Sequence, residues 1–247
     1  MQQGKRTKMK KKQAAVNEAI FGAGLPFAAA EAYKRLRTNI MFALPDEQRC
    51  RTVGITSACG GEGKSTTSVN LAYMLAEAGE RVLLIEADMR LPTICKRLHL
   101  QLAPGLSNVL ARQNGVNEVV QPAGLHEKLQ VISAGDIPPN PSELLGSKSM
   151  RTLMEVLCGN YDFIVLDLPP VTEVSDAIVA SKLVDGMLVV VRQDYAVRRA
   201  LAETMQQLRF AEAKILGFVM NQSDIQAKGK YKKKYKYGKS YESVRGS

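Results

Sequence analysis

Short runs of apolar, largely β-branched residues alternate along the chain with longer segments whose apolar residues recur every three or four positions. The short runs predict strands at residues 52–56, 82–85, 129–133, 163–166, 187–191 and 215–220. The longer segments predict helices at residues 31–44, 65–78, 142–157 and 197–211. Since nearly all the strands are apolar on both faces, we expect an α/β fold with a mostly parallel sheet and helices on both faces.

The alternation runs without a break through the body of the chain, so one domain is expected. With 247 residues and 45% hydrophobic content, the chain can bury a substantial core. We place this domain at residues 25–227, between flexible segments at 1–24 and 228–247. No run approaches the roughly 18 apolar residues of a membrane span, and the basic start lacks the apolar block of a signal peptide. We therefore expect the protein in the cytoplasm.

The formal net charge of +10 belongs to the two ends of the chain. Residues 1–12 carry six Lys or Arg, and residues 228–247 carry eight against one acid, which leaves a net charge of −3 for the body. Nucleic acid is therefore not expected as a partner of the body, although a basic tail that attracts nucleic acid or anionic lipid stays open as an alternative.

The four cysteines have no paired spacing, so the sequence indicates neither a zinc site nor a disulfide framework. They are Cys50, Cys59, Cys95 and Cys158. We expect reduced thiols at all four positions. Cys59 falls in a glycine-rich loop, where a small residue that offers its backbone is the expected role and a redox-sensing thiol is the alternative.

That loop follows the first predicted strand and precedes a helix, the context that a Walker A phosphate loop requires. The glycines let backbone amides point at phosphate oxygens, Lys64 reaches the outer phosphates, and the Ser65 hydroxyl holds Mg²⁺. Ala58 stands where the motif has its first glycine, and an ordinary glycine-rich turn is the alternative. The residues predicted to bind nucleotide are Cys59, Gly60, Gly61, Glu62, Gly63, Lys64, Ser65, Thr66 and Asn221.

Two further predicted strands end in carboxylates. Glu86 and Asp88 follow the second strand, and Asp167 ends the fourth in the layout of a Walker B aspartate. Because ligands bind at the carboxyl ends of parallel strands, these groups can converge on the nucleotide and its metal. We expect Ser65, Asp88 and Asp167 to hold Mg²⁺. A structural salt bridge is the alternative for the aspartates, and a buried structural amide is the alternative for Asn221.

With these motifs the sequence resembles the bacterial tyrosine kinases of capsule and exopolysaccharide systems, over roughly residues 25–245. The segments that carry the resemblance are 31–40, 57–67, 86–92, 105–110, 133–145, 167–171 and 176–177. The family is related to the ParA and MinD ATPases. The resemblance implies a P-loop kinase that uses ATP and Mg²⁺, with Lys64, Glu86, Asp88 and Asp167 as catalytic residues. In the family the residue at position 86 is suspected of helping to deprotonate the acceptor tyrosine.

Cys59, Gly60 and Glu86 depart from the patterns of these families. ParA and MinD proteins carry a signature lysine where this chain has Cys59, which favours the kinase. Gly60 replaces a proline common in the kinases. Glu86 replaces the first aspartate of the Asp-x-Asp-x-Arg motif, and its longer arm predicts shifted geometry and altered activity.

The C-terminal segment holds half of the chain's eight tyrosines within eleven residues. They are Tyr231, Tyr235, Tyr237 and Tyr241. Nothing in this lysine-rich segment can build a core, and the resemblance implies that these tyrosines are the autophosphorylation substrate. Each phosphate adds a charge of about −1.5 to −2, so phosphorylation would act as a charge switch on the tail.

The resemblance further implies a homo-oligomeric ring in which each subunit offers its tail to a neighbour. The family's contact motif Glu-x-x-Arg-x-x-Arg reads Glu31, Lys34 and Arg37 here, three residues on one helix face. Lysine lacks the bidentate contact of arginine, which predicts a weaker ring. An intrahelical ion pair fits the spacing equally well. A separate transmembrane adaptor that recruits the kinase to the membrane, and a cognate tyrosine phosphatase, are the other implied partners.

Two alternatives to the kinase stay open. One is a ParA-like ATPase switch without phosphotransfer. The other is a binding module whose basic tails hold DNA or membrane and whose binding falls steeply with salt.

Overall fold

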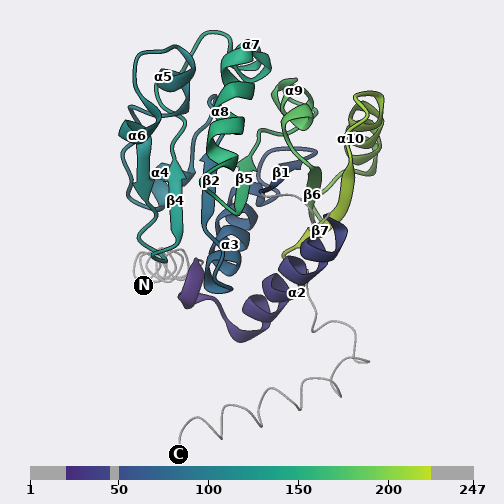
Figure 1. Cartoon of the computed structure of the whole chain (residues 1–247). Helices are drawn as coiled ribbons and strands as arrows, with labels where there is room; N and C mark the ends of the chain where they lie inside the picture. Colours follow the sequence, from purple (N-terminus) through teal and green to yellow (C-terminus); the bar gives the residue numbers. More distant parts are fainter. Residues whose placement is uncertain (1–20, 45–49, 224–247) are drawn as a thin grey trace, which may run out of the picture.

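The computed structural model describes residues 21–44 and 50–223, which form a seven-stranded sheet flanked by helices (Figure 1). The strands are β1 (Arg51–Ser57), β2 (Val82–Glu86), β3 (Val120–Pro122), β4 (Leu129–Ile132), β5 (Phe163–Asp167), β6 (Gly186–Arg192) and β7 (Ile215–Asn221). Their order across the sheet is β3-β4-β2-β5-β1-β6-β7. Only β3 runs antiparallel to its neighbour, so the predicted α/β fold with a mostly parallel sheet is confirmed.

Successive strand residues point to opposite faces of the sheet. Because both faces carry apolar side chains, helices cover both of them. Leu83 and Ile85 of β2 belong to one core cluster, and Val82 and Leu84 belong to the other. The larger helices are α2 (Phe27–Ala43), α3 (Lys64–Glu77), α8 (Lys148–Cys158) and α10 (Arg198–Phe210). The shorter ones are α4 (Ile94–Arg97), α5 (Leu106–Leu110), α6 (Val116–Val119), α7 (Pro141–Gly146) and α9 (Asp176–Ala180), with 3₁₀ turns η1 (Gly22–Gly24) and η2 (Ser181–Leu183).

The prediction of one helix at residues 142–157 is wrong. The structure has two helices there, because Ser147 leaves the helical conformation at φ −71° and ψ 159°. Its hydroxyl accepts a hydrogen bond from the Met150 amide at 3.1 Å and so caps the start of α8. The apolar spacing continues through the break, and this hid the break from a periodicity argument.

Three adjacent parallel strands position the candidate site. In the order β2-β5-β1, Glu86 pairs with Asp167 and Ile55 pairs with Asp167 from the other side. Since the strands run in the same direction, the residues that follow them gather at one edge of the sheet.

Among the described residues, none of the helices combines the length and the apolar character that a membrane span requires.

Candidate nucleotide site

The loop after β1 has the backbone conformation that its glycines permit. Gly61 and Gly63 adopt positive φ angles of 78° and 96°, and α3 begins at the next residue, Lys64. A Cβ atom at Gly63 would lie 1.9 Å from Nδ2 of Asn221, so only glycine fits there. The loop therefore leads directly into a helix N-terminus, as a phosphate-binding loop does.

Two residues predicted to bind nucleotide make hydrogen bonds that hold this loop in its conformation. The Asn221 side-chain amide donates to the Glu62 carbonyl at 2.9 Å. The Glu62 side chain is fully buried, and its Oε2 accepts from the Cys59 amide at 2.9 Å. Both side chains therefore contact the loop itself in this structure, and a direct contact of either with nucleotide stays a prediction.

Lys64 and two aspartates come together beside the loop, as the sequence predicted. The Lys64 ammonium lies 2.7 Å from Asp88 Oδ2 and 4.0 Å from Asp167 Oδ2. Burial by itself lowers the pKa of Lys64, but the carboxylates of Asp167 and Asp88 outweigh it and raise the pKa of this lysine. Lys64 is therefore held charged at the site, where it can meet an anionic phosphate.

Asp167 is the most buried acid of this cluster. Burial raises the pKa of its carboxyl against the opposing effects of the Lys64 charge and of hydrogen bonds from Ser65 and Ser68. Its Oδ1 accepts the Ser68 hydroxyl at 2.8 Å, while its Oδ2 is buried without a hydrogen-bond partner among the described residues. A buried carboxylate oxygen that accepts no hydrogen bond is costly unless a further ligand meets it.

Asp167 Oδ2, which accepts no hydrogen bond among the described residues, makes the cluster fit a magnesium ion. Mg²⁺ binds through one or two carboxylates together with hydroxyl, water and phosphate oxygens, without an all-protein cage. Ser65, Asp88 and Asp167 offer such a set of oxygens.

Glu86 has an unexpected position. Its side chain is fully buried, and its carboxylate accepts hydrogen bonds from the amides of Thr93, Ile94 and Cys95 at the start of α4. Burial raises the pKa of Glu86, and these amides oppose the rise. Its role in assisting an incoming phenol stays a prediction, because in the structure both carboxylate oxygens bind backbone amides at the start of α4.

A carboxylate that sequence reasoning missed lies on the phosphate loop. Glu173 is exposed, and its Oε1 accepts the Gly60 amide at 2.7 Å. The segment before it runs along the loop, with the Thr172 hydroxyl donating to the Ala58 carbonyl at 2.6 Å. The signal for Glu173 was its place six residues after Asp167, on the loop that follows a Walker B strand. Asp176, one of the residues that carry the family resemblance, is buried and accepts two hydrogen bonds from Arg90 at 2.9 and 3.1 Å, a contact that the sequence did not predict.

The end of β6 also contacts the loop. Arg192, the last residue of β6, donates to the Gly61 carbonyl at 3.4 Å, and its guanidinium lies 4.8 Å from the centroid of the Tyr195 ring. Thr66, in the first turn of α3, accepts from the Arg97 guanidinium at 2.9 Å. Arginines from two further segments therefore contact the phosphate loop and the helix start that follows it.

The residues predicted to contact a second subunit lie on α2. Lys34 and Glu31 form an intrahelical pair at 3.1 Å, each with more than 40% of its side chain exposed. Arg37 donates to the Met74 carbonyl at 2.8 Å and so ties α2 to α3. The intrahelical pair that the spacing allowed is therefore present, and a subunit contact through these residues stays a prediction.

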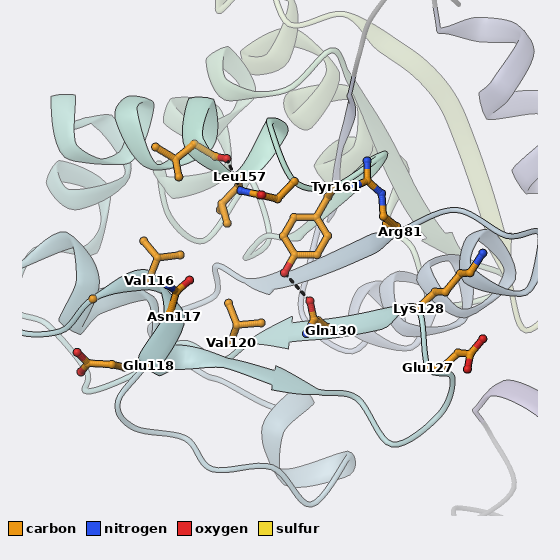
Figure 2. A pocket seen from close by; sticks show the side chains of 13 residues that line it. Arg81, Val116, Asn117, Glu118, Val120, Glu127, Lys128, Gln130, Leu157 and Tyr161 are labelled. Carbon is orange, nitrogen blue, oxygen red and sulfur yellow. Dashed lines mark hydrogen bonds between the residues drawn. The ribbon is translucent and has the colours of Figure 1, made fainter.

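Other predictions lie away from this part of the structure or outside it. The four tail tyrosines, the basic start and the end of the domain at 227 fall outside the described residues. A cavity of ≈ 850 Å³ opens at the amino ends of β2, β4 and β5, where the Tyr161 hydroxyl and Gln130 Oε1 are 2.6 Å apart (Figure 2). It lies at the opposite edge of the sheet from the phosphate loop and contains none of the predicted site residues.

A parallel sheet whose first strand leads into a glycine-rich loop, with a lysine and acidic strand ends beside it, defines a P-loop nucleotide-binding protein. Residues 49–244 match the family described as ParA, NUBPL iron-transfer P-loop NTPase. The tyrosine-protein kinase YwqD of Bacillus subtilis (strain 168) is 40% identical over 202 residues, which cover 82% of this chain and 84% of YwqD.

Two solved structures are similar to this chain in fold and in sequence. The chimerical protein CapA2B2 has 35% identity and a TM-score of 0.73, with 77% of this chain and 83% of that chain covered. The kinase domain of Escherichia coli tyrosine kinase ETK has 34% identity and a TM-score of 0.73, with 79% and 78% covered. The chain belongs to the family of bacterial tyrosine kinases, and the resemblance seen in its motifs is confirmed.

Proposed function

We propose that the protein transfers the γ-phosphoryl group of ATP to tyrosines of its own C-terminal tail and thereby regulates capsule or exopolysaccharide synthesis. The observation that carries the proposal is the contact of Lys64 with Asp88 and Asp167 beside the phosphate loop, in a chain of the tyrosine kinase family. Phosphoryl transfer needs little covalent chemistry from the protein, so catalysis rests on positioning and charge neutralisation.

Each residue of the site has a role in that scheme. The amides of the loop and the start of α3 bind phosphate oxygens. Lys64 neutralises negative charge on the outer phosphates and pairs with Asp88 when they are absent. Ser65, Asp88 and Asp167 would hold Mg²⁺, which neutralises phosphate charge and aligns the groups that react. Arg90 and Asp176, paired through two hydrogen bonds, fix the segment that follows Asp88.

The acceptor tyrosines are proposed to come from a neighbouring subunit in a ring, as the family resemblance implies. The Lys34 replacement predicts a weaker ring than an arginine would give. A separate transmembrane adaptor would bring the kinase to the inner face of the membrane and speed up phosphorylation. A cognate phosphatase would reverse the tail phosphorylation, which changes the charge of the lysine-rich segment.

Phosphotyrosine mapping tests the proposal directly. We expect incubation of the purified full chain with Mg-ATP to place phosphate on Tyr231, Tyr235, Tyr237 or Tyr241, measured by peptide mass spectrometry. Replacing all four by phenylalanine should remove the signal from the tail and leave ATP binding unchanged. ATP hydrolysis without any phosphotyrosine would contradict the kinase and support the ParA-like switch, which the match to the ParA family keeps as the second candidate.

Glu173 should weaken nucleotide binding, because it places a negative charge on the loop that receives a triphosphate. We expect Glu173→Gln to lower the Kd of ATP about three- to tenfold, as one charge acting over a few ångströms near the surface implies. Glutamine retains an acceptor for the Gly60 amide, so the loop keeps its shape. Isothermal titration at low and high salt measures the effect, which should shrink as salt rises.

The matched control is Glu77→Gln, the same change at an exposed residue at the far end of α3. It should leave the Kd of ATP at the wild-type value. If Glu173→Gln and Glu77→Gln bind ATP equally well, the charge of Glu173 has no influence on the nucleotide.

A further inference from the structure

Two cysteines that are distant in the sequence line one small cavity. Cys50 immediately precedes β1, and Cys158 is the last residue of α8. The cavity has a volume of ≈ 510 Å³ and lies at the amino ends of β1 and β6. It is therefore at the opposite edge of the sheet from the phosphate loop. This pairing could not be predicted from the spacing of the cysteines, because it arises only when the fold brings α8 against the start of β1.

Both cysteines pack in one cluster, with Cys50 inside it and Cys158 packed against it. Cys50 is 8% exposed, and Cys158 is partly exposed. A hydrogen bond between them is the main cause of opposite shifts, raising the pKa of Cys50 and lowering the pKa of Cys158. The more accessible sulfur is the one whose thiolate is stabilised, and this is the property of a reactive cysteine.

We propose that Cys50 and Cys158 form a peroxide-sensitive dithiol that closes to an intramolecular disulfide. Both sulfurs face the same open cavity, so an oxidant can reach the pair from solvent. A zinc site is not favoured, since no third His, Cys, Asp or Glu completes a metal-ligand group in residues 21–44 and 50–223. Disulfides in the reducing cytosol are usually transient and redox-sensing, which fits a pair that is a free dithiol here.

The chemistry balances with hydrogen peroxide as the oxidant. The Cys158 thiolate attacks one peroxide oxygen, the O–O bond breaks, and the hydroxide that leaves takes up a proton to become water. Cys158 is then a sulfenic acid. The Cys50 sulfur attacks the Cys158 sulfur, the S–O bond breaks, and the departing hydroxide leaves as water with the proton from Cys50. Two thiols are oxidised to one disulfide while one peroxide is reduced to two waters.

Two acidic residues, Glu155 and Asp185, line the cavity, and Asp185 accepts hydrogen bonds from the Thr52 amide and hydroxyl. The negative charge of Asp185 opposes thiolate formation at both cysteines, but the hydrogen bond between the thiols outweighs it at Cys158. Hydrogen peroxide is small and uncharged, so it can enter the cavity.

The cross-link would stabilise the sheet without blocking the nucleotide site. It ties the start of β1 to the helix that leads into β5, and these strands are neighbours with Arg51 opposite Phe163. The phosphate loop and Asp167 lie at the other ends of the same strands. Closing so long a loop restricts the unfolded chain strongly, so we expect the Tm to rise by about 5 °C or more.

Peptide mapping of the full chain tests the proposal, in a Cys59→Ser background that removes the thiol of the phosphate loop. After treatment with hydrogen peroxide and digestion by a protease that cuts after glutamate, residues 48–62 and 156–173 should appear as one disulfide-linked species. Iodoacetamide labelling of both cysteines should fall at least tenfold, and dithiothreitol should restore it. Cys95 is buried, with 5% of its surface exposed, and should stay a thiol throughout the peroxide treatment.

Single replacements separate the pair from other oxidation. Cys158→Ser and Cys50→Ser should each abolish the linked species and the peroxide-dependent rise in Tm. The proposal is overturned if both cysteines stay labelled after peroxide, or if Cys158 is overoxidised while Cys50 remains a thiol. Because the measurement needs neither ATP nor phosphotransfer, its failure would leave the kinase proposal untouched.

Discussion

Lys64→Met should reduce tail phosphotyrosine about a thousandfold, the scale of losing a cation that neutralises charge in the transition state of phosphoryl transfer. Methionine has nearly the length of lysine and fills the same space, so the loop can keep its shape. The lost element is the ammonium that lies 2.7 Å from Asp88 and 4.0 Å from Asp167. Quantitative phosphotyrosine mass spectrometry after incubation with Mg-ATP measures the effect.

A control distinguishes lost chemistry from lost structure. Lys182→Met makes the same change at an exposed lysine whose contact with Glu212 is 3.9 Å long, and it should leave phosphorylation unchanged. Lys64→Met should retain the wild-type circular dichroism spectrum, with a lower Tm because Asp88 loses its buried partner. Unchanged tail phosphorylation in a folded Lys64→Met protein would refute the proposed mechanism.

The phosphate loop could be predicted from sequence because its determinants are local. A strand, a glycine-rich turn and a helix start follow one another within one continuous segment, and each leaves a pattern of its own. The carboxylates of Asp88 and Asp167 were also placed correctly beside Lys64. Their convergence follows from the rule that residues after parallel strands gather at one edge of the sheet.

The features that sequence reasoning missed depend on contacts between distant segments. Glu173 reaches Gly60, and Cys50 meets Cys158, only after the sheet has formed. No periodicity encodes either contact. The short strand β3 was missed because it pairs through three residues only, at the edge of the sheet.

Glu86 makes contacts that its position in the motif did not predict. Its place in the Asp-x-Asp-x-Arg pattern predicted a catalytic carboxylate, yet its oxygens are bound by the amides at the start of α4. A motif defines where a side chain begins, whereas the surrounding backbone decides what its oxygens contact. The longer arm of glutamate lets it reach these amides, which no spacing argument on the strand could reveal.

Asp167→Asn should lower tail phosphorylation by on the order of a hundredfold or more, because it removes the buried oxygen that fits Mg²⁺. The same change should raise the Tm of the protein. Burial raises the pKa of Asp167 even beside Lys64, which means that the folded state disfavours the charge. Asparagine is neutral and nearly isosteric, so it removes that penalty and keeps an acceptor for the Ser68 hydroxyl.

The sign of the pH dependence follows from the direction of that shift. An acid with a raised folded-state pKa binds more protons in the folded state than in the unfolded state. Its penalty is absent below the ordinary carboxyl pKa and grows as pH rises through the folded-state pKa. The gain in Tm of Asp167→Asn over wild type should therefore be larger at pH 8 than near the ordinary carboxyl pKa of about 4, measured by thermal unfolding without nucleotide.

Asp88→Asn is the control that should move stability the other way. Asp88 Oδ2 lies 2.7 Å from the Lys64 ammonium, so its replacement leaves a buried cation without its direct partner and should lower the Tm. Both variants should lose phosphorylation, since both carboxylates are proposed to hold Mg²⁺. A rise in Tm for Asp167→Asn would show that Asp167 lowers the stability of the fold and is retained for function. A fall in Tm for Asp88→Asn would show that Asp88 also stabilises the fold by neutralising Lys64. A fall in Tm for Asp167→Asn would mean that Asp167 stabilises the fold through Lys64, and the functional explanation of its burial would then fail.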